Sequence, residues 1–260
     1  MPPALRRLAA APILLAAALL ALAFSAGAQE RTVRIVTEGA RPPFNYVENG
    51  EPAGFEVELG RALCAQARLA CTFGLHQWEG LVRGLLAREY DAVMASVAIT
   101  ERRRQRVAFT RPYYRMPGAF VGRKGLDFAP DAAGLKGRTV GIVERSPYGE
   151  LIAQRFPGVE LRPFDKAEDA NLDLLTGRVD LVFHEKLALA EFLGRREGKH
   201  CCRFYGDVPP AGPSLGEGVG MALRPDDGAL REAFDRAIAA VMADGTYDRI
   251  RAKYVAFDLR

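Results

Sequence analysis

An arginine close to the start of a short predicted helix is the residue best placed to hold an anion. The stretch YDAVMASVAITERRRQR, residues 90–106, predicts a buried strand over 91–96, then a turn and a helix. Thr100 is a good N-cap for that helix. A strand-to-helix turn of this kind lies at the carboxyl edge of an open α/β sheet, where backbone N–H groups meet ligands. Arg103 then stands in the first helical turn, where its planar guanidinium can take a carboxylate bidentately.

The charge pattern gives no reason to expect a nucleic acid as partner. Arg102, Arg104 and Arg106 are interpreted as a solvated helix face. The formal net charge of +4 falls to +2 without Arg6 and Arg7 of the N-terminal segment. A charge this small and this evenly spread is not that of a nucleic-acid-binding protein.

Motifs for catalysis and metal binding are absent from the sequence. It contains neither a G-x-S-x-G motif nor a Walker loop, and the glycines of residues 216–223 miss the G-x-G-x-x-G spacing. His76, His184 and His200 are scattered, and there is no Cys-x-x-Cys pair. We therefore expect no catalytic residue, metal or cofactor, and instead a binding site of polar residues at strand ends.

Residues 1–28 have the features of a cleavable secretory signal peptide. They contain a basic start, an apolar run over 9–24 and a small-residue end at 26–28, so cleavage is expected before Gln29. An uncleaved membrane anchor is the alternative, and the Ala-rich core and A-x-A end argue against it. No cysteine follows the run and no second long apolar segment exists, so we expect neither a lipoprotein nor a transmembrane receptor.

Strands and helices alternate along the rest of the chain, as in a protein with parallel β-sheets. Apolar residues at helical spacing, such as Phe55, Leu59 and Leu63, mark the helices that cover a sheet. The predicted strands are 33–36, 72–75, 91–96, 139–143 and 180–183, and predicted helices begin near Phe55, Trp78, Thr100, Ser146, Glu185 and Leu230. A further helix through 170–175 is predicted to end at Gly177, and a terminal helix to run through Tyr254.

This alternation occurs twice and predicts an α/β protein of two lobes. The residues after the signal peptide suffice for two lobes of about 100 residues each. The extended and polar residues 118–137 are interpreted as the crossing into the second lobe, and 216–223 as the return. We expect 29–119 plus 222–260 to form lobe 1 and 120–221 to form lobe 2, inserted in lobe 1 through a two-strand hinge.

The stretch DAVMASVAITERR, residues 91–103, resembles the motif D-A-[IV]-[MI]-x-[SG]-x-[ST]-I-T-x-x-R of bacterial solute-binding protein family 3. Members of this family are periplasmic receptors that deliver polar amino acids to ABC importers. The resemblance covers nearly the whole mature chain and is nearest to the lysine/arginine/ornithine- and histidine-binding group. It implies a type II periplasmic binding protein fold, doubly wound in both lobes, and a periplasmic monomer that serves an inner-membrane ABC permease.

The resemblance also implies how the two ends of a zwitterion are held. Arg103 matches the arginine that binds the ligand's α-carboxylate, and Ser96 and Ser146 match hydroxyls that meet the same group. Glu185 occupies the position of the acid, more often Asp in the family, that takes the α-amino group. A charged hydrogen bond to Arg103 is worth about 1.5–3 kcal/mol and each hydroxyl bond about 0.5–1.5 kcal/mol, so the loss of hydroxyls should weaken carboxylate binding or widen the pocket without abolishing binding.

The implied side-chain pocket combines matches with departures. Glu38 falls where basic-amino-acid binders have an acid facing the ligand's distal cation, and Trp78 lines the same pocket. Ala95 and Ala98 replace hydroxyl residues that the family commonly has, which makes room but removes hydrogen bonds. Arg41 replaces an aromatic residue that stacks on the ligand side chain. It can pair with Glu38, meet a second ligand carboxylate or lie in solvent.

Simpler interpretations exist for several of these residues. Glu38 could be a solvated loop acid and Glu185 an acid at a helix N-terminus. Trp78 could belong to the core.

Four cysteines remain after export to an oxidising compartment. Cys64 and Cys71 can close a small loop between a helix and the next strand. The basic-amino-acid binders of the family carry a disulfide at this spacing, which implies the same pair here. Cys201 and Cys202 could form a vicinal disulfide, stay as thiols or pair with a small thiol.

The favoured ligand is a basic amino acid, because of Glu38 and the Cys64–Cys71 pair. An opine-like or acidic derivative comes next, because the alanines make room and Arg41 adds a cation. An exported cyclohexadienyl dehydratase of the same fold family is an alternative, with acid–base groups from residues 184–186. Neighbours along a strand alternate in direction, which argues against it. A ligand-sensing module without transport is a further alternative.

Overall fold

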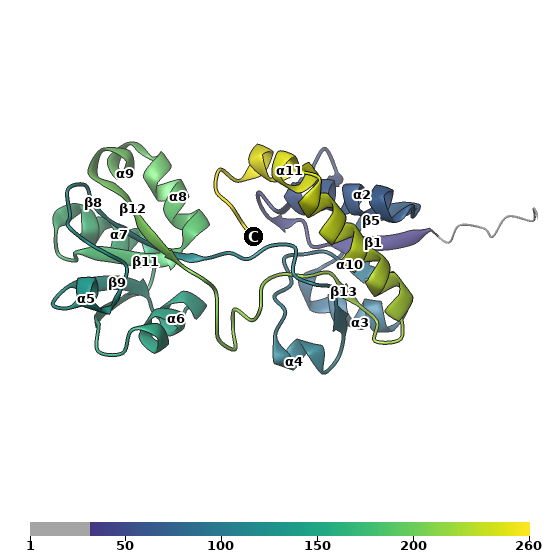
Figure 1. The fold of residues 1–260 in the computed structure, drawn as a ribbon, viewed down its shortest axis with the longest axis horizontal. Helices are drawn as coiled ribbons and strands as arrows, with labels where there is room; N and C mark the ends of the chain where they lie inside the picture. The colour runs from purple at the N-terminus through teal and green to yellow at the C-terminus, as the bar shows by residue number, and fades with distance from the viewer. Residues whose placement is uncertain (1–31) are drawn as a thin grey trace, which may run out of the picture. The chain divides into compact units, whose positions relative to one another are not determined.

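Two five-stranded sheets form the framework of residues 32–260, the part of the chain that this computed structural model describes (Figure 1). The predicted signal peptide lies outside these residues. In both sheets three parallel strands are followed by two that each pair antiparallel with their neighbour. The first has the order β5-β1-β6-β13-β7, with strands Cys71–Leu75, Val33–Thr37, Ala92–Val93, Ala222–Leu223 and Ala108–Phe109. The second has the order β10-β9-β11-β8-β12, with strands Glu160–Phe164, Thr139–Val143, Leu181–Glu185, Gly118–Arg123 and Cys202–Val208.

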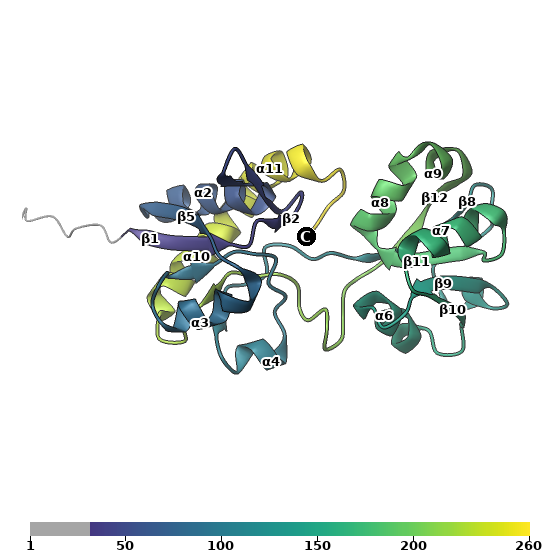
Figure 2. The same ribbon diagram turned by 180° about the vertical axis from the view of Figure 1, so that it is seen from behind.

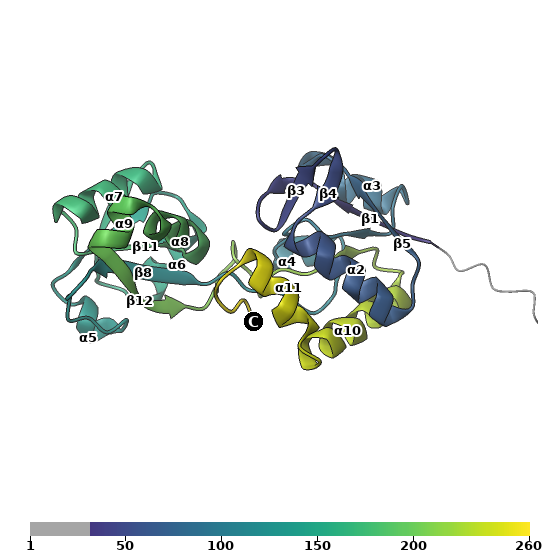
Figure 3. The same ribbon diagram turned by 90° about the horizontal axis from the view of Figure 1, so that it is seen from above.

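Helices cover both faces of the first sheet. Adjacent residues of its strands point to opposite sides, so its buried strands place apolar side chains on both faces. Ile35 of β1 joins the core cluster of α2, whereas Val36 joins the cluster that contains Leu81 and Leu85 of α3. Figure 3 shows α2, α10 and α11 together on one side of β1 and β5, with α3 on the other. These helices span Phe55–Ala67 (α2), Leu81–Leu86 (α3), Gly228–Ala243 (α10) and Thr246–Tyr254 (α11).

The second sheet is covered in the same manner. Phe120 of β8 packs in one cluster with Leu151 and Ile152 of α6, whereas Val121 packs with residues of α7 and α8. Figure 2 shows these helices around β9 and β11. The helices of this part are Ala132–Leu135 (α5), Pro147–Arg155 (α6), Ala167–Thr176 (α7), Lys186–Gly194 (α8) and Arg196–Cys201 (α9).

Two segments, residues 110–117 and 209–221, run between the sheets, and they contact each other. The backbone N–H of Tyr113 donates to Val219 O at 2.9 Å, and that of Val219 donates to Tyr114 O at 2.9 Å. Strand β8 pairs with both β11 and β12, so residues 118–123 already belong to the second sheet. The first crossing therefore precedes residue 118, earlier than the polar stretch in which we expected it.

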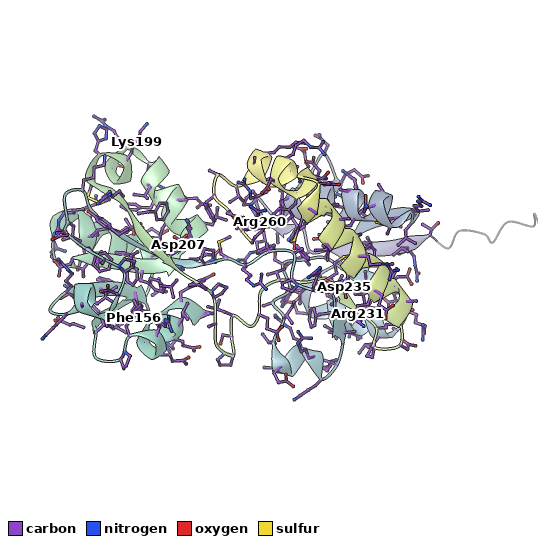
Figure 4. All side chains as sticks on the ribbon, in the orientation of Figure 1. Phe156, Lys199, Asp207, Arg231, Asp235 and Arg260 are labelled. Carbon is purple, nitrogen blue, oxygen red and sulfur yellow. A yellow bond between two sulfur atoms is a disulfide. The ribbon has the colours of Figure 1, made fainter. Side chains whose placement is uncertain are left out.

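Helix α10 fixes the start of the first crossing. Arg231 and Asp235, labelled in Figure 4, form an ion pair of 3.2 Å along the helix. Asp235 also accepts the backbone N–H of Arg111 at 2.6 Å. One carboxylate thus connects a surface helix to the chain segment that leaves the first sheet.

Most predicted elements and caps are present, and the strand before Arg103 is the main correction. It is predicted over 91–96, but only Ala92–Val93 form β6, and Ser96 has a left-handed backbone with φ of 52°. Thr100 caps the following helix α4, Glu101–Arg104, as predicted. Ser146 accepts the N–H of Gly149 at 3.0 Å and caps α6. The elements that were not predicted include strands β7, β10 and β12 and helices α5 and α9.

A small antiparallel sheet borders the first one, in the order β2-β3-β4. Asn49 and Gly50 both have positive φ at the turn between β3 and β4, as their types predict. The chain then enters α2, which packs against β3 and β4. The three strands span Ala40–Arg41 (β2), Asn45–Glu48 (β3) and Glu51–Ala53 (β4).

All four cysteines are paired, as Cys64–Cys71 and as the neighbours Cys201–Cys202. The first bond joins α2 to β5 with Cα atoms 6.3 Å apart. The second bond is a vicinal disulfide, one of the three states that the sequence left open for Cys201 and Cys202. Within residues 32–260, no helix has the length and apolarity needed to span a membrane.

We expect Cys64→Ser/Cys71→Ser to lower the free energy of unfolding by about 2–4 kcal/mol, because an open loop gives the unfolded chain more freedom. Urea unfolding monitored by circular dichroism measures this change. Cys201→Ser/Cys202→Ser is the control, since a bond between neighbours constrains almost no chain. Equal losses in both variants, or no loss in the first, would contradict the expected role of the Cys64–Cys71 bond.

Candidate functional site

A pocket of about 380 Å³ lies between the two sheets and contains seven of the eight predicted ligand-binding residues. The segment after β6 and helix α4 supply one wall, and the ends of β9 and β11 supply the other. The crossing segments contribute Tyr114 and Val219. The predicted residues at this pocket are Arg41, Trp78, Ser96, Ala98, Arg103, Ser146 and Glu185.

Glu38 is the predicted residue that the structure does not bring to this pocket. It lines a separate hollow with Ala40, His76 and Trp78. The indole of Trp78 borders both spaces, so a ligand would have to extend past this ring to reach Glu38. The predicted meeting of Glu38 with a distal cation stays a prediction.

The guanidinium of Arg103 faces the pocket without a carboxylate partner among the described residues. Its Nη1 donates to Ala98 O at 2.9 Å, and its Cζ atom lies 5.5 Å from the ring centroid of Trp78. Burial, and then the neighbouring charge of Arg102, lower the pKa of Arg103. Both effects disfavour the charged form of Arg103, and an anion bound beside the guanidinium would offset them.

Glu185 is the acidic group of the pocket, and it is paired with Arg41. Arg41 Nη2 lies 3.3 Å from Glu185 Oε1 and 3.4 Å from Oε2. Burial raises the pKa of Glu185, and the positive charge of Arg41 opposes that rise. Arg41 therefore does not pair with Glu38, which was one of its predicted alternatives.

The two predicted serine hydroxyls already have partners within the protein. Ser96 Oγ donates a hydrogen bond to Glu56 Oε2 at 3.0 Å and accepts one from Asn45 Nδ2 at 3.2 Å. Ser146 Oγ donates to Val143 O at 2.7 Å while it caps α6. Each hydroxyl has a second lone pair, but their first role in this structure is to hold the backbone that surrounds the pocket.

Glu56 organises one side of the pocket and was not predicted. It is fully buried at the start of α2, and its two oxygens accept four bonds, from Tyr113 Oη, Asn45 Nδ2, Ser96 N and Ser96 Oγ. Burial raises its pKa, and these hydrogen bonds oppose the rise. The network connects β3, the segment after β6 and the first crossing. An acid between the apolar residues Phe55 and Val57 was the only sequence signal for it.

Aromatic residues of the pocket divide into packed and exposed ones. Tyr114 is buried and stacks on Phe44 with ring centroids 4.7 Å apart, and Tyr148 Oη donates to Met116 O at 3.1 Å. Trp78 is 38% exposed, so it does not belong to the core, which was its alternative interpretation. The two tyrosines were not predicted as pocket residues.

The three neighbouring residues that the dehydratase alternative requires are separated. Lys186 pairs with Asp207 and lies 4.7 Å from the ring centroid of Phe257. His184 lines the pocket, and burial lowers its pKa, which favours the neutral ring. Glu185 alone of the three carries a charge into the pocket. Within residues 32–260 no three His, Cys, Asp or Glu side chains gather in a way that could hold a metal ion.

Comparisons with known proteins show the family of this chain. The model of the bacterial extracellular solute-binding proteins, family 3, matches residues 33–257. The L-arginine-binding protein of Pseudomonas aeruginosa is 35% identical over 248 residues, 94% of this chain and 95% of the relative. The histidine-binding periplasmic protein of Salmonella typhimurium is 34% identical over 249 residues, 92% of this chain and 95% of the relative.

A solved structure from Silicibacter pomeroyi, a periplasmic His/Glu/Gln/Arg/opine family-binding protein in complex with lysine, is 32% identical. It superimposes with a TM-score of 0.55 over 88% of this chain and 99% of its own. The family match and both curated relatives extend over nearly all described residues, including both sheets and the pocket between them. This chain belongs to the bacterial extracellular solute-binding proteins of family 3.

Proposed function

We propose that this protein is the substrate-binding component of an ABC importer and captures an amino acid in the pocket between the two sheets. The observation that carries the proposal is the half-buried guanidinium of Arg103, which has no carboxylate partner among the described residues, across a pocket from the carboxylate of Glu185. One cation and one anion on opposite walls are complementary to a zwitterion. The family match supports binding rather than catalysis.

The ligand's two charged ends would be held by different parts of the chain. Arg103 would bind its α-carboxylate, and Glu185 would bind its α-ammonium. We propose that the first sheet with its helices is lobe 1 and that the second sheet with its helices is lobe 2. The bounds are those predicted, 29–119 plus 222–260 and 120–221, except that Gly118 and Ala119 go with lobe 2 because β8 begins at Gly118. Binding at both walls then favours an arrangement in which the lobes approach each other.

A basic amino acid is the favoured ligand. The relatives include an arginine-binding and a histidine-binding protein, and Glu38 could receive a distal cation that extends past Trp78. An opine-like or acidic derivative comes next, because Ala98 and Arg41 offer space and a cation. Its side chain would point away from Glu38.

Periplasmic location is supported by the relatives, several of which are named as periplasmic proteins. We propose that residues 1–28 direct export and are removed. The protein would then act as a monomer that delivers its ligand to an inner-membrane permease.

A thermal-shift screen of the twenty amino acids, opines and dicarboxylates tests the function. We expect at least one basic or polar amino acid at one hundred times its Kd to raise Tm by about 5–10 °C. Calorimetry then gives the Kd of each ligand that shifts Tm. The absence of a shift with any amino acid or derivative would contradict the proposal, and turnover of arogenate or prephenate would replace it with the dehydratase.

A further inference from the structure

The carboxylate that the ligand's ammonium needs is occupied by a side chain of the protein itself. Arg41 Nη2 lies within 3.4 Å of both Glu185 oxygens, although 144 positions separate the two residues in the sequence. The carboxylate side chain is only 19% exposed, whereas that of Arg41 is 46% exposed. Arg41 is the only described residue that forms an ion pair with Glu185.

Neighbouring contacts fix the backbone on both sides of this ion pair. The backbone carbonyl of Arg41 accepts the N–H of Phe44 at 2.9 Å, and its guanidinium lies 6.0 Å from the Phe44 ring centroid. Glu185 ends β11, where it pairs in register with Gly118 of β8, and α8 begins at the next residue. The guanidinium therefore presents one cation to the carboxylate, as a ligand ammonium would.

We propose that Arg41 is a specificity-determining residue, an internal cation that holds Glu185 in the ligand-free protein and that the ligand's ammonium must displace. This inference rests on the proposed function, because it needs an amino acid whose ammonium reaches Glu185. Part of the ammonium's binding energy is then offset by the loss of the Arg41–Glu185 pair. The affinity for a neutral amino acid is lower than the pocket would otherwise give.

The displaced guanidinium also sets the preferred charge of the ligand side chain. It stays in the pocket wall, since β2 and the contact with Phe44 hold its residue. A cationic side chain beside it is repelled, whereas a carboxylate side chain gains a partner for Arg41 while the ammonium takes Glu185. Relative to the same pocket without this cation, Arg41 thus lowers the affinity for basic and neutral amino acids and raises it for acidic ones.

Calorimetry with L-arginine, L-glutamine and L-glutamate on the wild type and on Arg41→Gln tests this directly. We expect the variant to bind glutamine about two- to fivefold more tightly, the size expected when a partly exposed ion pair no longer competes. Arginine should gain at least as much, whereas glutamate should lose affinity. Arg41→Tyr, which adds an aromatic surface, should shift the ranking further towards arginine.

Two control variants isolate the competition. In a Glu185→Gln background, Arg41→Gln should no longer improve glutamine binding, because no charged pair remains to be broken. Arg104→Gln removes a surface cation that pairs with Glu217 and should leave all three affinities unchanged. Weaker glutamine binding by Arg41→Gln would show that Arg41 is a direct ligand contact and would overturn the proposal, as would equal changes for all three ligands.

Failure of this inference can be told apart from failure of the proposed function. If the wild type binds an amino acid but Arg41→Gln leaves the ligand ranking unchanged, only the inference is overturned. If neither protein binds any of the three ligands or any other amino acid, the proposed function is overturned and the inference with it.

Discussion

Replacing Arg103 by alanine is expected to weaken amino-acid binding at least ten- to hundredfold, because the α-carboxylate loses its charged hydrogen bonds. Arg103 has no carboxylate partner among the described residues, so its guanidinium is available to the ligand. The serine hydroxyls nearby cannot compensate, since Ser96 and Ser146 already donate to Glu56 and Val143. Calorimetry with the best ligand of the thermal-shift screen measures the loss.

Two further variants separate charge from geometry at this position. Arg103→Lys keeps the cation but loses the planar fork, so its affinity should lie between those of the wild type and Arg103→Ala. Arg102→Ala removes an equal charge from the neighbouring, exposed residue and should change affinity little. An equal loss in Arg102→Ala would mean that the ligand senses only the general positive field, and the assignment of Arg103 would be withdrawn.

Local signals explain why much of the fold could be predicted. Thr100 and Ser146 cap helices through bonds to residues three positions later, and such contacts depend only on nearby sequence. Helix α7 ends at Gly177, whose left-handed backbone follows from its residue type. The strand before Arg103 was overestimated because its apolar residues continue to Ala95, while Ser96 turns the chain.

The arrangement of the pocket was less predictable, because it depends on contacts between distant residues. Glu56 bonds to Tyr113, 57 positions away, and to Ser96, 40 positions away. Nothing in the local sequence of Ser96 indicates that its hydroxyl is used in this way. The pairing of Arg41 with Glu185 is also set by the fold, which brings β2 to the end of β11.

The resemblance to family 3 predicted positions but not partners. Seven of the eight residues lie at one pocket, and three of them, Ser96, Ala98 and Arg103, belong to the family motif of residues 91–103. Glu38 lies in the neighbouring hollow, on the far side of Trp78. A position in an alignment therefore indicates which wall a residue belongs to, whereas burial and charge decide what it contacts.

Replacing Glu185 by alanine is expected to weaken binding about tenfold or more and also to reduce ligand-driven closure. In the proposed arrangement the ligand first binds Arg103 and its ammonium then faces the wall that carries Glu185. In this arrangement the ammonium reaches Glu185, in place of Arg41, only when that wall approaches. The energy of this contact therefore exists in the closed arrangement alone. A ligand shifts a conformational equilibrium only by its difference in affinity between the two states.

X-ray scattering of the wild type, Glu185→Ala and Glu144→Ala, each with and without saturating ligand, measures closure separately from affinity. The wild type should become more compact on binding, whereas Glu185→Ala should keep a larger radius of gyration even when saturated. Glu144→Ala is the matched control, since Glu144 follows β9 of the same sheet but is exposed and pairs with Arg145. It should close like the wild type. Full compaction of saturated Glu185→Ala would mean that other contacts drive closure, and Glu185 would then lose its assigned role as the second half of the clamp.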